Sequence, residues 1–273
     1  MEGTMKYREC VIVRGGGDIA TGTIYRLHQA GFKVIILEIK NPTAIRRTVS
    51  FSQAIFDGEV DVEGVRSRLC ATNEQIDQAH IDHVIPIVVD PEGDSIDVYK
   101  PLVVIDAILA KKNLETHKNL ADIVIGLGPG FSAGRDVHAV IETNRGHNLG
   151  RVIYNGEAET NTGIPGNIDG YTWERVIYSP DNGPINVYRD IDSLVEVGDI
   201  MAEVNGKPVI AVISGLVRGM IQQGTTVFKG MKIADVDPRG TKIDTHIISD
   251  KARSIGGAVL EAILHLEMGI KDI

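Results

Sequence analysis

The stretch Val11-Ile12-Val13-Arg14-Gly15-Gly16-Gly17-Asp18-Ile19-Ala20 reads as a buried strand, a glycine turn and the start of a helix. A helical run follows, and then Val34-Ile35-Ile36-Leu37-Glu38, a second strand closed by an acid. The glycine pattern fits G-x-G-x-x-G/A, in which a tight turn lets backbone N–H groups approach a pyrophosphate at a helix N-terminus. The sequence therefore predicts a strand-helix-strand unit that opens a parallel sheet.

The segment between the two strands supports a Rossmann-like reading of this unit. Apolar residues recur at helical spacing up to Leu27, and Gly31 stands where a left-handed C-terminal cap belongs. Glu38 lies about twenty residues beyond the turn, where an acid accepts hydrogen bonds from the ribose of NAD. Asp18, however, is also typical of a helix N-terminus, and Lys40 suits a 2′-phosphate or another anion. Nucleotide binding and a nucleotide-free structural unit therefore both stay open.

Composition limits the classes of partner. The chain has 273 residues, 43% of them apolar, which is enough for two domains. A formal net charge of −9 argues against binding nucleic acid or an anionic membrane through a basic surface. Cys10 and Cys70 form no disulfide framework, and no apolar run is long enough to cross a bilayer. We expect a soluble cytoplasmic protein whose partner is a small ligand or another protein.

Continuous apolar runs at 84–89 and 102–105 predict further strands buried on both faces, and 121–125 is expected to be the next strand. Asp106 closes one of them, and the glycine-rich loop 126–130 leaves another. Ligands collect outside the carboxyl ends of the strands in open parallel sheets, so this loop and the first glycine turn are expected to line one crevice. Residues 1–125 are therefore predicted to be a Rossmann-like nucleotide-binding domain.

Residues 126–273 have a different texture, with short β-like runs separated by glycine and proline. The pattern of residues 194–204 reappears at 226–236, with valine, glycine, alanine and an acid in register. This repeat resembles the quasi-symmetric barrel-sandwich of biotinyl and lipoyl domains. We expect a β-rich second domain with such a segment at 183–240, followed by a C-terminal helix from about Asp250 to Met268 that Ser249 caps.

Polar residues of the middle segment suggest acid-base groups and cations suited to an anionic ligand. His138 and Glu142 fall on one strand face, although such a pair is also common as a structural one. His80 and His83 have metal-ligand spacing but no evident third ligand, so no metal site is predicted. The candidate catalytic residues are Lys112, Glu142, Arg145 and His147, and the candidate cofactor-binding residues are Arg14, Gly15, Gly16, Gly17, Asp18, Ala20, Glu38, Asp106, Gly126, Gly128 and Gly130.

Several motifs together resemble those of one family over nearly the whole chain. They include Arg14-Gly15-Gly16-Gly17-Asp18, Gly126-Leu127-Gly128-Pro129-Gly130-Phe131 and Asn161-Thr162-Gly163-Ile164-Pro165-Gly166. The chain resembles the YqeB-type accessory proteins of selenium-dependent molybdenum hydroxylases. The resemblance implies a cytoplasmic maturation factor with a Rossmann unit similar to that of XdhC chaperones, a molybdopterin-type cofactor and the hydroxylase apoenzyme as partner.

Two alternatives accompany this hypothesis. The first is an NAD-dependent oxidoreductase in which Glu38 holds the ribose, and the second is a non-catalytic docking scaffold for the hydroxylase. In the ligand-binding versions a molybdopterin-type cofactor or NAD(P) lies over the two glycine loops. The sequence leaves open whether a reaction is catalysed and whether the chain forms a homo-oligomer.

Overall fold

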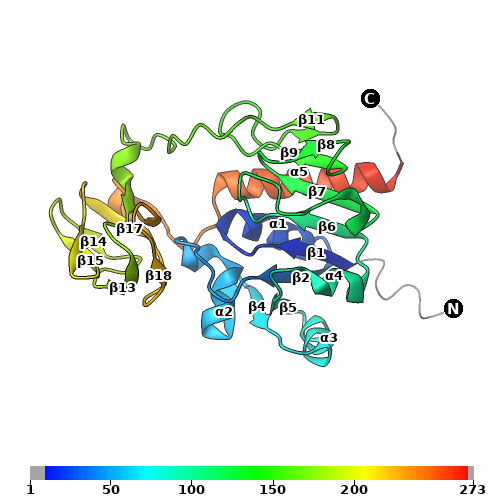
Figure 1. The fold of residues 1–273 in the computed structure, drawn as a ribbon, viewed down its shortest axis with the longest axis horizontal. Coiled ribbons are helices and arrows are strands. Elements are labelled where there is room, and N and C mark those ends of the chain that lie inside the picture. The colour runs from blue at the N-terminus through cyan, green and yellow to red at the C-terminus, as the bar shows by residue number, and fades with distance from the viewer. Residues whose placement is uncertain (1–9, 270–273) are drawn as a thin grey trace. The chain divides into compact units, whose positions relative to one another are not determined.

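The structure is a computed structural model, and it describes residues 10–269, which divide into two compact units (Figure 1). Unit 1 contains the described residues up to Pro42, then Ser50–Asn161, and the chain from Ile248 onward. Unit 2 contains Thr43–Val49 and Thr162–Ile247. The predicted boundary between residues 125 and 126 is therefore wrong. The chain beyond 126 continues the large sheet of unit 1, and the C-terminal helix returns to it.

Unit 1 is built on a nine-stranded sheet with the strand order β10-β9-β7-β6-β1-β2-β5-β4-β3. The strands, in that order, are Val152–Ile153, Ala139–Ile141, Ile123–Leu127, Val103–Asp106, Cys10–Arg14, Lys33–Glu38, Ile85–Val89, Val65–Leu69 and Glu59–Val62. The two edge strands β10 and β3 are antiparallel to their neighbours, and the other pairings are parallel. The sheet is thus mixed, and the predicted Rossmann-like parallel sheet confined to residues 1–125 is wrong.

Strand side chains alternate between two buried faces, as the continuous apolar runs predict. Ile12, Ile35 and Val104 point to a face that Ile76 and Tyr99 cover. These two come from α3 (Asn73–Ile81) and α4 (Asp94–Tyr99). β8 (Ser132–Ala133) and β11 (Gly156–Glu157) pair with each other in a separate two-stranded antiparallel sheet. Thr72 caps α3, because its hydroxyl accepts the Gln75 amide hydrogen.

The helix α1 (Asp18–Gln29) packs against α5 (Asp250–Glu267), and α5 also contacts β7, β9 and β10. The crossing is close because both helices carry glycine there. A Cβ atom on Gly22 would lie 2.3 Å from the Ala252 carbonyl oxygen, and one on Gly256 would lie 2.4 Å from the Gly22 carbonyl oxygen. The predicted cap of α5 is confirmed, since the Ser249 hydroxyl accepts the Ala252 amide hydrogen at 3.2 Å.

Unit 2 contains two antiparallel four-stranded sheets, ordered β12-β19-β17-β14 and β16-β15-β13-β18. The first sheet comprises Val176–Tyr178, Lys232–Asp237, Gly215–Met220 and Leu194–Val195, and the second comprises Lys207–Ile210, Ile200–Val204, Gly183–Val187 and Thr226–Val227. Their shared core includes Met201, Val217 and Ile233, all fully buried. The β15–β16 turn is Asn205-Gly206, with both φ angles positive, as a two-residue type I′ turn requires.

The internal repeat has a clear structural counterpart. Residues 194–204 form β14 and β15, and residues 226–236 lie in β18 and β19. In each copy the short strand joins one sheet and the longer strand joins the other. The prediction of a barrel-sandwich at residues 183–240 is nevertheless wrong. β12 lies outside that range and belongs to the first of two separate antiparallel sheets.

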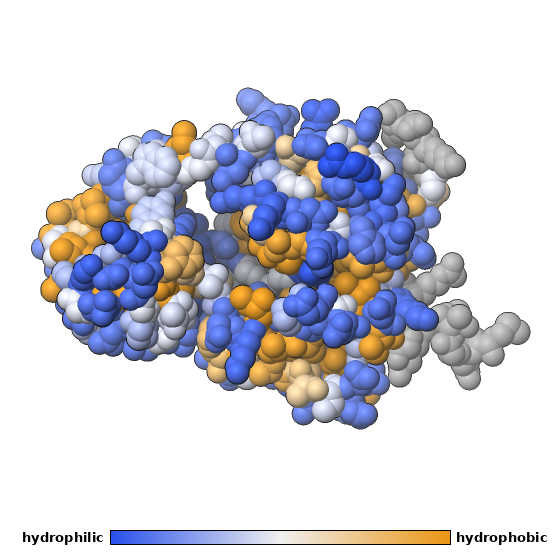
Figure 2. All heavy atoms as spheres, in the orientation of Figure 1, coloured by the Kyte–Doolittle hydropathy of each residue, from blue (hydrophilic) through white to orange (hydrophobic). Residues whose placement is uncertain are grey.

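Short helices and turns connect these strands: α2 (Ala54–Asp57) and the 3-10 turns Arg47–Val49, Phe51–Gln53, Lys118–Leu120, Trp173–Arg175 and Gly240–Lys242. Several large apolar side chains are exposed on unit 2, among them Leu194, Val197 and Ile200. Figure 2 shows this region as orange spheres where Figure 1 labels β14 and β15. Within residues 10–269 no helix has the length and apolar character needed to cross a bilayer.

Candidate functional site

Three loops meet where β1, β6 and β7 end, at the carboxyl edge of the large sheet. A Cβ atom on Gly15 would lie 3.0 Å from the Ala107 carbonyl oxygen, and one on Gly130 would lie 2.8 Å from the Lys112 backbone nitrogen. Both glycines have positive φ angles, so the chain needs glycine there for conformation as well as for space. The prediction that the two glycine loops lie at one edge agrees with these contacts.

The first glycine turn is largely occupied by the protein itself. The Gly15 amide donates to the Leu37 carbonyl at 2.8 Å, and the Gly16 amide donates to Glu38 Oε1 at 2.9 Å. Gly17 is the N-cap of α1 and has open space where a Cβ would stand. The expectation that the amides of Gly15 and Gly16 are free for a pyrophosphate is therefore wrong in this structure. Only the Gly17 end of the turn faces open space.

Glu38 ends β2, but its carboxylate turns back toward the glycine turn. Besides the Gly16 amide, it accepts the Ile39 amide hydrogen at 2.8 Å through Oε2. Burial raises the pKa of Glu38, although these two amides lower it. Both carboxylate oxygens are thus used to hold the turn, so the predicted ribose contact competes with bonds that stabilise the fold.

Arg14 and Asp106 are both hydrogen-bonded to the buried hydroxyl of Thr116. The Thr116 hydroxyl donates to Asp106 Oδ2 at 2.6 Å and accepts from Arg14 Nη1 at 2.7 Å. Asp106 also accepts the Ile108 amide hydrogen. Burial raises the pKa of Asp106, against the bonds from Thr116 and Ile108 and the charge of Arg14. The two residues predicted to bind a cofactor instead fix the loop that follows β6.

The remaining glycine candidates serve close packing. A Cβ atom on Gly126 would lie 2.4 Å from the Phe131 ring, and one on Gly128 would lie 2.5 Å from the Thr143 hydroxyl. Ala20 is 1% exposed and faces the core. These residues shape the edge of the sheet, and their predicted contact with a cofactor stays a prediction.

The four candidate catalytic residues differ in their surroundings. Glu142 is 2% exposed and accepts amide hydrogens from Asn144 at 2.6 Å and Glu159 at 2.7 Å. Arg145 pairs with Asp250 of α5 through two hydrogen bonds of 2.9 and 3.0 Å. His147 and Lys112 are exposed on turns. The structure thus joins Arg145 to the N-terminus of α5, while the charge of Glu142 acts on Lys251 in the first turn of that helix.

Lys251, in the first turn of α5, is the residue that sequence reasoning missed. Its side chain is partly buried, and among residues 10–269 it makes neither a hydrogen bond nor an ion pair. Burial and the charge of Arg145 lower the pKa of Lys251, while the charges of Asp18 and Glu142 oppose that shift. The capping pattern at Ser249 predicted where the helix starts, but nothing in the sequence showed which loops its first turn meets.

No group of three or more histidine, cysteine, aspartate and glutamate side chains able to hold a metal ion occurs in the described part of the chain. The groups gathered at the carboxyl edge are a partly buried amine, the guanidinium of Arg145 and the buried carboxylate of Glu142. This set of groups is suited to contact with a small charged molecule.

Fold and site together define an α/β protein with charged groups at the carboxyl edge of a mixed sheet. No family model matches the sequence. The chain is similar to the uncharacterized protein YqeB of Escherichia coli (strain K12), with 50% identity over 264 residues. The match covers 96% of this chain and 49% of that protein, so this chain spans about half the length of its relative. The predicted resemblance to YqeB-type proteins is confirmed as a resemblance.

The comparison with solved structures gives a different group. It finds the ectoine utilization protein EutE of Ruegeria pomeroyi at a TM-score of 0.25 and 11% identity, covering 84% of this chain and 85% of that one. It also finds an aspartoacylase family protein of Mesorhizobium loti at a TM-score of 0.27 and 10% identity, covering 85% of each chain. At these TM-scores the likeness carries no argument for a shared activity.

The proteins in these structures are described as other kinds of protein than those that the sequence analysis predicted. They are described as ectoine utilization and aspartoacylase-type proteins, not as chaperones of molybdenum hydroxylases or nicotinamide enzymes. The predictions of a hydroxylase maturation factor and of an XdhC-like Rossmann unit are corrected on this comparison, and the alternatives of an NAD-dependent oxidoreductase and a docking scaffold find no support in it.

Proposed function

We propose that unit 1 binds a small molecule that carries a phosphate or carboxylate group, at the carboxyl edge of its large sheet, with Lys251 as the residue that contacts the anion. The observation that carries the proposal is the environment of Lys251. This partly buried amine has no hydrogen-bond or ion-pair partner among residues 10–269. An ammonium group deprived of water and of a partner is costly to the fold, and a bound anion removes that cost.

The topology of the sheet supports this location. From β1 the chain builds β2, β5, β4 and β3 on one side, and then crosses to β6 on the other side of β1. The strand order therefore reverses between β1 and β6. In open α/β sheets, ligands bind outside the carboxyl ends of the strands at such a reversal. The turn at Gly17 and the loop after Asp106 follow those two strands.

The start of α1 supplies a second attraction for an anion. Gly17 is the N-cap of this helix, which runs from Asp18 to Gln29, and a Cβ atom on Gly17 would meet no other atom within 4 Å. The first-turn amides of a helix carry a partial positive charge and favour anions. The charge of Asp18, the first residue of α1, acts on Lys251 and opposes the lowering of its pKa, which places the amine near this end of the helix.

The ligand identities suggested by the sequence, a molybdopterin-type cofactor or NAD(P), both carry phosphate and stay proposals. The hydroxylase apoenzyme as a protein partner also stays a prediction. The chemistry of the site fits the phosphate of such a molecule better than its ribose, because Glu38 is already engaged by the Gly16 amide.

Isothermal titration of the full chain with inorganic phosphate, ADP and NADPH, each in turn, tests the proposal. We expect saturable binding of at least one of these anions and a loss of affinity of tenfold or more in Lys251→Met. Lys229→Met is the matched control, because it removes the same charge from an exposed position of unit 2. The proposal fails if none of the three anions binds, or if Lys251→Met and Lys229→Met bind equally well.

A further inference from the structure

Arg218 of unit 2 is a largely buried guanidinium group whose donors are not used. It lies on β17, and its side chain is 17% exposed. The nearest carboxylate oxygens are Asp235 Oδ2, at 3.5 Å from Nη1, and Asp237 Oδ2, at 4.0 Å from Nε. Neither contact is a hydrogen bond, and within residues 10–269 Arg218 makes no other. A guanidinium carries five N–H donors, and burying them without acceptors costs free energy.

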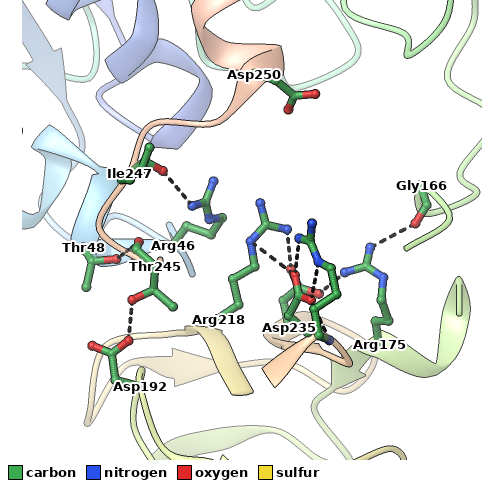
Figure 3. Close-up of polar contacts among 12 residues, drawn as sticks. Arg46, Thr48, Gly166, Arg175, Asp192, Arg218, Asp235, Thr245, Ile247 and Asp250 are labelled. Atoms are coloured by element: carbon green, nitrogen blue, oxygen red, sulfur yellow. Dashed lines mark hydrogen bonds and ion pairs between the residues drawn. The ribbon is translucent and has the colours of Figure 1, made fainter. Parts of the chain in front are cut away.

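The two carboxylates beside Arg218 are already taken by other arginines. Arg175 Nη1 donates to Asp235 Oδ1 at 2.7 Å, and Arg239 donates to both oxygens of Asp237 at 2.9 and 2.8 Å. Figure 3 shows Arg175 and Arg218 both directed toward Asp235, with the second amino group of Arg175 on the Gly166 carbonyl. Asp235 and Asp237 therefore satisfy their direct partners and leave Arg218 at longer range.

The cluster carries more positive than negative charge. Three guanidinium groups face two carboxylates, which leaves one positive charge in excess even with both carboxylates ionised. Burial opposes ionisation of Asp237, but the bonds from Arg239 and the charge of Arg218 outweigh it, so the pKa of Asp237 is lowered. Arg175 adds a buried Nε that has no acceptor among the described residues.

We propose that Arg218 binds an oxyanion of a small molecule, a carboxylate or a phosphate group, on the face of the β12-β19-β17-β14 sheet, with Arg175 and Arg239 holding the supporting carboxylates in place. The planar fork of a guanidinium presents two parallel N–H groups that match two oxygens of either anion. The inference goes beyond the proposed function, because Arg218 belongs to unit 2 and Lys251 to unit 1.

The test is a titration of the full chain with inorganic phosphate and, separately, with succinate. We expect saturable binding of at least one, with affinity reduced tenfold or more in Arg218→Gln. Arg189→Gln is the matched control, since Arg189 is exposed in the same unit, and it should bind as the natural chain does. Binding of phosphate alone indicates a phosphate-bearing ligand, and binding of succinate alone indicates a carboxylate-bearing one.

The inference is overturned if neither anion binds, or if Arg218→Gln binds with unchanged affinity, whatever Lys251→Met does. Arg218 makes no hydrogen bond that Gln would break, so the variant should fold, which circular dichroism checks. Should it not fold, Arg218→Lys decides the matter. It keeps the charge but loses the fork, and we expect reduced affinity for the same anion, whereas unchanged affinity contradicts the inference.

Discussion

At the scale of single residues, Thr116 connects two buried charges that do not meet directly. Arg14 Nη1 and Asp106 Oδ2 are 3.8 Å apart, and the Thr116 hydroxyl lies between them with hydrogen bonds of 2.7 and 2.6 Å. One hydroxyl thus accepts from the guanidinium and donates to the carboxylate. The loop after β6 depends on this bridge, because the Ile108 amide donates to Asp106 and the Leu114 carbonyl accepts from Arg14.

Thr116→Val should destabilise unit 1, because valine keeps the shape of threonine and removes both hydrogen bonds. A buried donor and a buried acceptor then lose their partner, at a cost of about 1 to 3 kcal/mol. Urea unfolding followed by circular dichroism measures the change. Thr160→Val is the control, since Thr160 is exposed in the same unit. Equal unfolding free energies for the two variants would contradict the role given to Thr116.

Residue roles were the hardest feature to predict from sequence. Arg14, Asp106 and Glu38 follow their strands as ligand-binding residues do, but each is used inside the fold by Thr116 or Gly16. No sequence motif surrounds Lys251, and its lowered pKa results from burial and from the charge of Arg145, which lies far from it in the sequence. A sequence pattern indicates at which end of a strand or helix a side chain lies. Its hydrogen-bond partner depends on tertiary packing, which the pattern does not contain.

At the scale of elements, α1 and α5 form the closest helix pair of unit 1. Gly22 and Gly256 let the two backbones approach until the carbonyl of each meets the other helix. Gly257, the next residue of α5, has open space where a Cβ would stand. Two adjacent glycines of one helix therefore have opposite structural roles, which makes them a matched pair.

Gly256→Ala and Gly22→Ala should each destabilise the chain, because the new methyl group meets backbone atoms that cannot rotate away. Overpacking of this kind costs about 1 to 3 kcal/mol. Gly257→Ala should instead stabilise by up to about 1 kcal/mol, since alanine favours the helix and meets nothing. Thermal unfolding of the three variants checks this ordering. A lower melting temperature for Gly257→Ala than for Gly256→Ala would be inconsistent with the helix crossing described.

The elements themselves followed well from the sequence. The strands after Val84, Leu102 and Ala121, the cap at Thr72 and the helix after Ser249 all occur where the apolar period and capping residues indicate. The spacing of apolar residues could not predict which sheet a strand joins. Val152–Ile153 reads like a strand of a second domain, but it pairs with β9 at the edge of the large sheet.

At the scale of the whole molecule, the chain leaves and re-enters each unit. Thr43–Val49 belongs to unit 2, where the Ile45 carbonyl accepts the Met220 amide hydrogen at 2.8 Å. From the sequence alone, such a short segment is assigned to the domain that surrounds it. Its contact with Met220 joins residues that are far apart in the chain, and no local sequence pattern predicts such a contact. The division into two units was therefore predictable in number, and its boundaries were not.

Anion binding by the partly buried amine of Lys251, proposed for the edge of the large sheet, can be tested through the amine itself. Amine-selective labelling of the full chain over the alkaline pH range, with peptide mass analysis, reports the protonation and access of this residue. Because burial and Arg145 lower its pKa, Lys251 should lose its proton below the ordinary lysine value of 10.5. Anion affinity should then fall as pH rises through that lowered pKa, since only the ammonium form attracts the ligand.

The decisive comparison is labelling with and without a saturating concentration of whichever of phosphate, ADP and NADPH binds in the titration. We expect the anion to protect Lys251 and to leave the exposed Lys229 as reactive as before. Labelling of Lys251 that is unchanged by the bound anion, with loss of its proton at or above pH 10.5, would show that Lys251 is not the anion contact.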